Sequence, residues 1–201
     1  MQAKESKKQK LYEFAKTAGI LRVRDVTAAG FHSEDLRRLV AEGVLSRGPR
    51  GVYYAEESDI TEYHTLAEVC KRVPAGVICL LTALRFHELT TQNPWNVWLA
   101  IDPKARKPRL DYPELRIARF SGSALTEGVE VHQIEGVMVK VFSPAKTVVD
   151  CFKYRNKVGL DVALEAIKDY ARRYRGGMDD LWRFAKICRV ANVMRPYLEA
   201  I

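Results

Sequence analysis

Residues 32–54 read HSEDLRRLVAEGVLSRGPRGVYY. The first half of this stretch has the spacing of an amphipathic helix, in which apolar side chains three and four positions apart share one face. These apolar side chains are Leu36, Leu39 and Val40. Ser33 is a favourable N-cap residue, and Gly43 is of the type that often follows a helix C-terminus. We therefore predict a helix from Ser33 to Gly43 that buries this face and exposes Arg37 and Arg38.

The second half of the same stretch predicts a β-hairpin. Residues 44–47 and 51–54 are rich in β-branched and aromatic side chains. The residues between them, Gly48, Pro49 and Arg50, are typical of a tight turn with basic character near its tip. We expect two short antiparallel strands here, directly after the helix.

Two helical segments precede this stretch. Residues 11–18 carry apolar side chains on one face and are followed by Gly19, and the short segment 22–29 is followed by Gly30. The order is therefore helix, short helix, capped helix and hairpin. This order predicts a winged helix-turn-helix over residues 1–55, whose third helix would enter the major groove of DNA.

The rest of the chain predicts a second, larger domain over residues 62–201, after an acidic and polar linker at 56–62. Strands are expected at residues 77–79, 95–101, 115–120, 129–134 and 137–142. Helices are expected at residues 61–72, 80–89, 160–174, 178–188 and 192–200, and Ser143 followed by Pro144 opens another. The fold class is therefore α+β: a winged helix-turn-helix, then a mixed domain with a small β-sheet and a helical C-terminal end.

The charge of the chain favours a polyanionic partner. The formal net charge is +8, and the isoelectric point is about 9.3. Residues 1–55 hold eleven Lys and Arg against six Asp and Glu, whereas the other 146 residues hold 22 against 19. The basic excess is thus concentrated in the predicted winged helix-turn-helix, as expected for a DNA-binding domain.

The candidate DNA contacts form four groups. The recognition helix would present His32, Ser33 and two arginines to base edges or phosphates, the preceding segment would hold the DNA backbone, the wing would contact a neighbouring groove or strand, and the N-terminal lysines would bind phosphates. The complete set is Lys7, Lys8, Lys10, Arg22, Arg24, His32, Ser33, Arg37, Arg38, Arg47 and Arg50. The alternative is a protein-interaction module whose cations are a solvated face. It predicts weak, sequence-independent DNA binding that is lost at moderate salt.

No catalytic constellation is recognisable. Ser121-Gly122-Ser123 resembles the turn of nucleotidyltransferases, but the next strand offers only Glu130, with Glu135 at the turn, where that fold needs two or three carboxylates for magnesium. Residues 129–142 hold no E-x-K triplet, and the histidines at 64, 87 and 132 lack metal-ligand spacing. We expect no catalytic residue, no metal and no cofactor, and we expect that the protein is not an enzyme.

Several other residues are expected to be structural. The cysteines, each with at least one apolar residue directly beside it, are read as buried thiols: Cys70, Cys79, Cys151 and Cys188. Asp150 lies on an apolar helix face, where a hydrogen bond or ion pair is expected, with Arg155 as a possible partner. His87 is read as a packed histidine, and Trp95 and Trp98 as core residues.

Two further expectations concern a basic loop and the location of the protein. The basic loop 104–109 is either a solvated loop or an auxiliary contact for phosphate or a protein. No apolar run reaches the roughly 18 residues of a membrane helix, and the N-terminus lacks the apolar stretch of a secretory signal, so we expect a cytoplasmic protein.

Longer stretches of the sequence resemble a known family, the AbiEi antitoxins of bacterial type IV toxin–antitoxin (abortive infection) systems. The resemblance covers nearly the whole chain. It rests on residues 19–30 (GILRVRDVTAAG), 36–39 (LRRL), 43–45 (GVL), 50–53 (RGVY), 77–84 (VICLLTAL), 85–89 (RFHEL), 91–94 (TQNP), 143–152 (SPAKTVVDCF), 154–161 (YRNKVGLD), 185–190 (AKICRV) and 193–198 (VMRPYL).

The resemblance implies two roles. The N-terminal domain would bind inverted repeats in the promoter of its own operon and repress it. The C-terminal domain would counter the cognate toxin, a nucleotidyltransferase-like protein, without forming a stable complex. The contrasting hypothesis is that the C-terminal domain is an unusual phosphotransferase or nucleotide-handling enzyme that inactivates the toxin.

Overall fold

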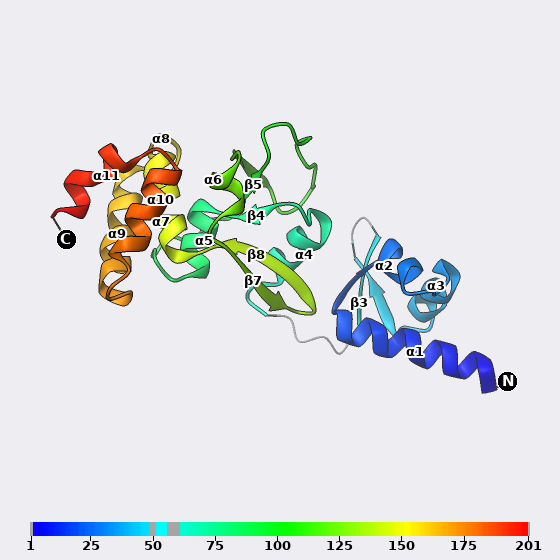
Figure 1. Cartoon of the computed structure of the whole chain (residues 1–201). Coiled ribbons are helices and arrows are strands. Elements are labelled where there is room, and N and C mark those ends of the chain that lie inside the picture. Colours follow the sequence, from blue (N-terminus) through cyan, green and yellow to red (C-terminus); the bar gives the residue numbers. More distant parts are fainter. Residues whose placement is uncertain (1, 49–50, 56–60, 201) are drawn as a thin grey trace. The chain divides into compact units, whose positions relative to one another are not determined.

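The computed structural model describes residues 2–48, 51–55 and 61–200, with side chains from residue 7 onward. The chain divides into two compact units (Figure 1). The first comprises Met1–Arg72 and Gln133–Val139, and the second comprises Val73–His132 and Lys140–Ile201. Both contain helices and a small sheet, which confirms the α+β prediction. The division into domains at 1–55 and 62–201 stays a prediction.

The first unit contains helices around a three-stranded antiparallel sheet of order β1-β3-β2. The expected hairpin is present, with Ser46 opposite Tyr54. Strand β1 was not expected from the sequence, and it pairs with β3 rather than with its neighbour in the chain. The elements are α1 (Gln2–Ala18), β1 (Ile20–Arg22), α2 (Val23–Ala28), α3 (Ser33–Ala41), β2 (Leu45–Arg47), β3 (Val52–Ala55) and α4 (His64–Arg72).

Glycines end α2 and α3 in the same way. Gly43 has φ +72°, its N–H donates to the carbonyl of Val40, and the next N–H donates to the carbonyl of Leu39. Gly30, with φ +82°, follows α2 with the same pair of hydrogen bonds. Both are Schellman motifs, which use a left-handed residue that glycine adopts without strain. The two stops fix the turn between α2 and α3 and the start of the wing.

The start of α3 differs from the expectation by one residue. Ser33 is the first helical residue, and His32 is the N-cap, with extended backbone angles and no side-chain capping hydrogen bond. The prediction of Ser33 as the N-cap was therefore wrong. As a result, the Ser33 hydroxyl is exposed and is not used to cap the helix.

The core of the first unit joins α1, α3 and the sheet. Leu11 and Ala15 of α1 are fully buried against Leu36 and Leu39 of α3, and Leu45 of β2 belongs to the same cluster. Burying one leucine side chain contributes about 1.5–3 kcal/mol. This cluster fixes which face of α3 is turned inward, and therefore which face remains exposed.

The second unit contains a five-stranded sheet of order β6-β5-β4-β8-β7 and a helical end. Strand β5 runs parallel to β6 and antiparallel to β4, which is parallel to β8. The expected strands are all present, and the ends of β7 and β8 coincide with the predicted ones. The elements are β4 (Val77–Ile78), α5 (Leu80–Phe86), β5 (Val97–Ile101), β6 (Leu115–Arg119), α6 (Ser123–Thr126), β7 (Val129–Ile134), β8 (Val137–Phe142), α7 (Pro144–Lys153), α8 (Arg155–Val158), α9 (Leu160–Arg173), α10 (Met178–Ile187) and α11 (Ala191–Leu198).

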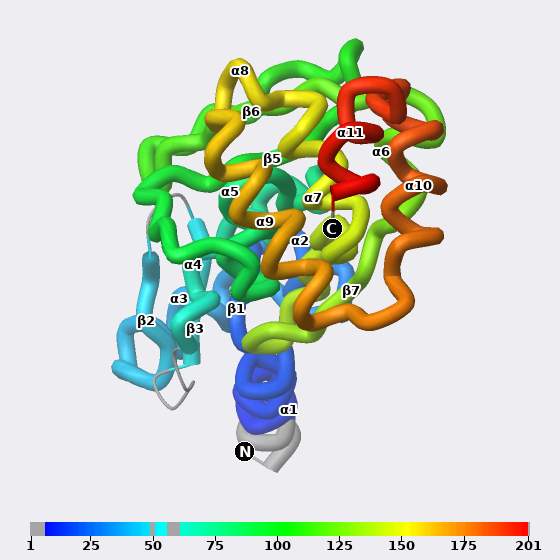
Figure 2. Tube along the Cα trace, turned by 90° about the vertical axis from the view of Figure 1, so that its left-hand side faces the viewer, coloured from blue at the N-terminus to red at the C-terminus, as the bar shows by residue number. Residues whose placement is uncertain are grey.

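Helix α7 packs against α5, α9 and α10 in the second unit (Figure 2). It carries a fully buried ion pair in which Lys146 Nζ lies 2.5 Å from Asp150 Oδ2. Cys188 Sγ donates to the other oxygen of Asp150 at 3.3 Å. The expected partner, Arg155, instead donates to the carbonyl of Phe152. The arginine prediction was wrong because a residue four positions away on the same helix face is closer than one past the helix end.

The predictions for the cysteines and for Trp98 were confirmed, and the prediction for Trp95 was wrong. All four cysteines are free and buried, as predicted. Trp98 is buried but Trp95, at 72% exposure, is not a core residue. Strand β5 begins only at Val97, so the alternation that would have placed Trp95 does not extend to it. Within the part of the chain that the structure describes, no helix has the length and apolar character needed to cross a bilayer.

Candidate nucleic-acid interface

Helix α3 presents one polar face to solvent. Its apolar side is held by the core of the first unit, so His32, Ser33, Arg37 and Arg38 are exposed. These four predicted DNA-contact residues all lie on or next to one helix of nine residues, about 14 Å long. The structure therefore brings together the candidate base-reading residues that the sequence assigned to this helix.

The two arginines of α3 are available to an incoming ligand. Arg37 Nη1 lies 3.4 Å from Glu34 Oε2, but the arginine side chain is 75% exposed, so this pair contributes little and is easily exchanged. Arg38 is exposed and makes no ion pair with any described residue. Each can therefore reach a phosphate or a guanine edge without breaking a buried interaction.

The wing adds one described cation. Arg47 at the end of β2 is exposed, next to Gly48, whose N–H donates to the carbonyl of Val52 and closes the hairpin. Arg50, predicted for the same wing, lies outside the described residues. The described part of the wing thus presents one arginine on an ordered hairpin.

The N-terminal lysines lie on the first turns of α1. Lys7 and Lys10 are exposed, and Lys8 forms an ion pair with Glu42, the C-cap of α3. Lys8 is still half-exposed, so it can bind a phosphate only by exchanging this surface partner.

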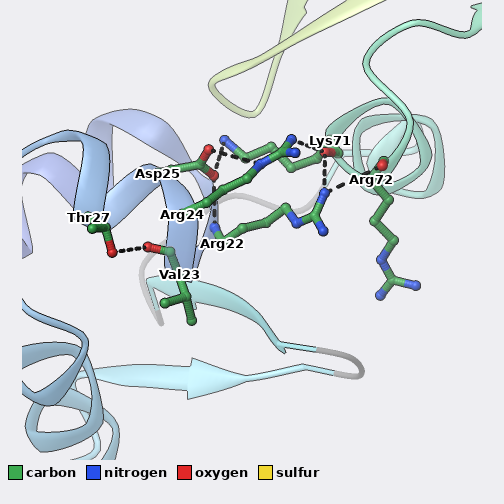
Figure 3. A network of polar contacts seen from close by, with 7 residues as sticks. All are labelled: Arg22, Val23, Arg24, Asp25, Thr27, Lys71 and Arg72. Atoms are coloured by element: carbon green, nitrogen blue, oxygen red, sulfur yellow. Dashed lines mark hydrogen bonds and ion pairs between the residues drawn. The ribbon is translucent and has the colours of Figure 1, made fainter.

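The two arginines around the start of α2 have a structural partner (Figure 3). Arg22 Nη1 donates to the carbonyls of Lys71 and Arg72 at 3.4 Å each, and Arg24 Nη2 donates to that of Lys71 at 3.5 Å. These are carbonyls of the last turn of α4, where a helix favours positive charge. Asp25 completes the cluster by accepting the N–H of Arg22 and pairing with Lys71 Nζ at 3.0 Å.

This cluster gives Arg22, a predicted DNA contact, a structural role. Burial, with the neighbouring charge of Arg24 next, lowers the pKa of the Arg22 guanidinium, which remains protonated at neutral pH. Arg22 therefore uses its guanidinium to bind the last turn of α4. No sequence pattern indicates this contact, because its partners are backbone atoms about 50 residues away. A DNA-backbone contact by Arg22 or Arg24 stays a prediction.

Sequence reasoning also missed the role of Glu135 in the first unit. At the tip of the β7–β8 hairpin, its carboxylate accepts from Thr61 N at 2.7 Å, from Thr61 Oγ1 at 2.8 Å and from His64 Nδ1 at 2.6 Å. Burial raises the pKa of Glu135, but these hydrogen bonds outweigh it and hold the pKa below its ordinary value. The tip approaches the end of α1 so closely that a Cβ at Gly19 would lie 1.8 Å from the carbonyl oxygen of Glu135.

The titratable groups that were weighed for catalysis are used structurally. His87 is packed, as predicted: its Nε2 lies 2.7 Å from the carbonyl oxygen of Phe142, and burial lowers the pKa of this histidine. Gly122 of the Ser-Gly-Ser segment is the N-cap of the short helix α6. Among the described residues, no three His, Cys, Asp or Glu side chains are grouped to hold a metal ion.

Three helices followed by a wing, with two exposed arginines on the third helix, define the first unit as a winged helix-turn-helix of the kind found in DNA-binding regulators. Residues 9–55 match the family AbiEi_4, described as "Transcriptional regulator, AbiEi antitoxin". The resemblance to the AbiEi antitoxins is thereby confirmed over this segment, which contains α3 and the wing. No curated protein matches the sequence.

One solved structure has a similar fold over much of the chain. It is described as "Crystal structure of RV2827C protein from Mycobacterium tuberculosis", with a TM-score of 0.54 and 15% sequence identity. The match covers 84% of this chain and 66% of that one, so the chain spans slightly less than two thirds of the similar structure. At this identity the similarity concerns the fold alone.

Proposed function

We propose that the protein is a DNA-binding repressor of its own toxin–antitoxin operon. The observation that carries the proposal is the coincidence of two findings on one segment. Residues 9–55 match the AbiEi transcriptional regulators, and the same residues expose Arg37 and Arg38 on a helix whose opposite face is buried. Such a helix can enter the major groove while its buried face keeps it on the scaffold.

The proposed contacts separate into reading and positioning. Arg37, Arg38, His32 and Ser33 read base edges, and each good bidentate arginine–guanine contact discriminates by about 1–3 kcal/mol. The exposed lysines of α1 and Arg47 of the wing bind phosphates and position the protein without reading sequence. The operator is double-stranded DNA, with inverted repeats in the protein's own promoter.

The antitoxin part of the proposal follows from the family. The protein would act in the bacterial cytoplasm as a type IV antitoxin in abortive infection, a form of phage defence. It would oppose a nucleotidyltransferase-like toxin without a stable complex, with residues 62–201 as the antitoxin domain. We also propose that it acts by binding and not as an enzyme. The second candidate, an enzymatic C-terminal domain, has no specific observation in its favour.

The test is a titration of the full chain onto its own upstream promoter DNA and onto a scrambled duplex at about 0.15 M salt. Arg37→Ala plus Arg38→Ala should remove the preference for the promoter, by up to about 1–3 kcal/mol for each arginine that reads a base. A matched control is Arg172→Ala plus Arg175→Ala, which removes two exposed cations from the second unit. Equal binding of both duplexes by the unaltered protein would contradict the proposal, as would an equal reduction in the control.

A further inference from the structure

The loop between β5 and β6 forms an ordered basic segment in the second unit. It connects two parallel strands by residues 102–114, and β6 is an edge strand of the five-stranded sheet. Parallel strands begin at the same end of a sheet, so the loop must return from the end of β5 along the length of β6. It therefore extends over about 13 Å, and four exposed cations (Lys104, Arg106, Lys107 and Arg109) and one exposed aromatic ring project from it.

The backbone at the start of this loop, residues 102–105, is held by Arg119 of β6. Its Nη1 donates to the carbonyls of Asp102 at 2.7 Å, Pro103 at 3.1 Å and Ala105 at 2.5 Å. The Asp102 carboxylate accepts the N–H of Lys104 at 2.8 Å, so this acid is used within the loop. Lys104 lies within this held segment and Arg106 directly follows it, so part of the cationic segment is displayed on a preformed backbone, which lowers the ordering cost of binding.

The cations of the loop are concentrated in its first half. Lys104, Arg106 and Lys107 are all exposed, and residues 104–109 include no acidic side chain. Arg109, Asp111 and Glu114 follow in the second half, which therefore carries more acidic than basic side chains, so the positive part of the loop lies nearer the end of β5. A chain of phosphates fits such a positive segment.

Two large aromatic side chains are exposed at the other end of the loop. Trp95 is 72% exposed and Tyr112 is 71% exposed, the two highest values among the large apolar side chains described. Val97 pairs with Leu115, and its N–H donates to the carbonyl of Glu114 at 2.9 Å. Trp95 and Tyr112 therefore enter neighbouring strands at the same end of the sheet. Large exposed apolar side chains that are grouped on one surface are typical of a binding site.

We propose that this surface, formed by the loop 102–114 and Trp95, binds single-stranded nucleic acid. Lys104, Arg106 and Lys107 contact the phosphates, and the rings of Trp95 and Tyr112 stack on unpaired bases. Single strands are selected over duplexes because only unpaired bases expose a face for stacking. The surface is separate in sequence from α3 and the wing, so the inference does not depend on operator binding.

The test uses the full chain and fluorescein-labelled oligomers of about twelve nucleotides, one of uridine and one of thymidine, at about 0.15 M salt. Trp95→Ala and Tyr112→Ala should each weaken binding at least about 5-fold, as expected for the removal of one stacked base. Lys104→Gln with Arg106→Gln and Lys107→Gln should reduce the slope of log affinity against log salt by about 2.

Controls separate this surface from general basicity and from the helix-turn-helix. Arg172→Gln with Arg175→Gln and Lys186→Gln removes the same charge elsewhere and should leave oligomer binding within about 2-fold, since these exposed cations lie outside the surface. Arg37→Ala plus Arg38→Ala should likewise retain it. As a second measurement, oligomer binding should quench the tryptophan fluorescence of the unaltered protein more than that of Trp95→Phe.

The outcomes decide the proposal. Weaker binding in the aromatic variants supports it, whether uridine, thymidine or both oligomers bind, and a preference for uridine identifies RNA through its 2′-hydroxyl. Unchanged binding in Trp95→Ala and Tyr112→Ala overturns it. Absence of oligomer binding also overturns the proposal, as does loss of binding in the Arg37 and Arg38 variant. Polyglutamate serves as an acidic probe without bases, and if it bound equally well, the partner would be an acidic protein and the proposal would be overturned.

Discussion

Replacement of Lys146 by methionine tests the buried ion pair of α7. The side chains of Lys146 and Asp150 have no exposed surface, and Lys146 Nζ also lies 4.0 Å from the ring centre of Phe142. Methionine keeps most of the volume but leaves Asp150 with the Cys188 thiol as its one hydrogen-bond partner among the described side chains. Removal of one member of a buried pair costs about 3–5 kcal/mol, so we expect a destabilisation of this size at neutral pH.

The destabilisation caused by Lys146→Met should depend on pH through the titration of Asp150. Burial raises the pKa of Asp150 above its ordinary 3.8, and removal of the lysine, which lowers it, raises this pKa further. A group whose pKa is raised on folding favours the folded state below its unfolded pKa and loses that advantage as the pH rises through its folded pKa. The deficit of the variant should therefore be small near the unfolded value and should grow as the pH rises toward neutrality.

The assay is urea unfolding of the full chain at several pH values, followed by a spectroscopic signal that reports on the second unit. Lys168→Met, an exposed lysine on α9, is the matched control and should change the free energy of unfolding by less than about 0.5 kcal/mol. The double variant Lys146→Met with Asp150→Leu removes the unpaired charge and should recover most of the stability. A destabilisation below about 1 kcal/mol in the single variant, or no recovery in the double, would refute the reasoning.

Three further predictions concern the first unit. Leu36→Ala should destabilise it by about 2–5 kcal/mol, measured by thermal unfolding, because the fully buried side chain leaves a cavity between α1 and α3; an unchanged Tm would contradict the described core. Gly19→Ala should lower the Tm because φ is +60° and the new Cβ would collide with the hairpin tip, whereas Gly30→Ala, which meets no atom within 4 Å, should cost only about 1–2 kcal/mol of backbone strain. Glu135→Gln should cost about 1–3 kcal/mol at neutral pH. The pKa of Glu135 is lowered, so the unaltered protein should lose this contribution as the pH falls from 4.5, and the variant should lack that acid-dependent part.

The elements that the sequence predicted well are those fixed by local signals. The hairpin of β7 and β8 has its turn at Glu135 and Gly136, both with positive φ, and a helix with a regular apolar face such as α9 is visible from periodicity alone. Strand β1 was missed because it has only three residues and owes its existence to pairing with β3, some 30 positions later.

The candidate interface was predictable in part for the same reason. The exposed face of α3 follows from its apolar spacing, so Arg37 and Arg38 could be assigned without the structure. The hydrogen bonds of Arg22 to α4 could not be predicted from the sequence. Their acceptors are the terminal backbone carbonyls of α4, and every sequence provides such atoms. The exposure of Trp95 was missed because it depends on where β5 begins.

The hairpin that carries Glu135 limits how the protein can be divided. Its residues 133–139 belong to the first compact unit, while the rest of both strands belongs to the second, so the chain passes between the units three times. A fragment that ends at Arg72 would contain the helix-turn-helix but lose the acceptor for Thr61 and His64. The winged helix-turn-helix is thus not self-contained, and its exchange with another protein at a single junction would leave it incomplete.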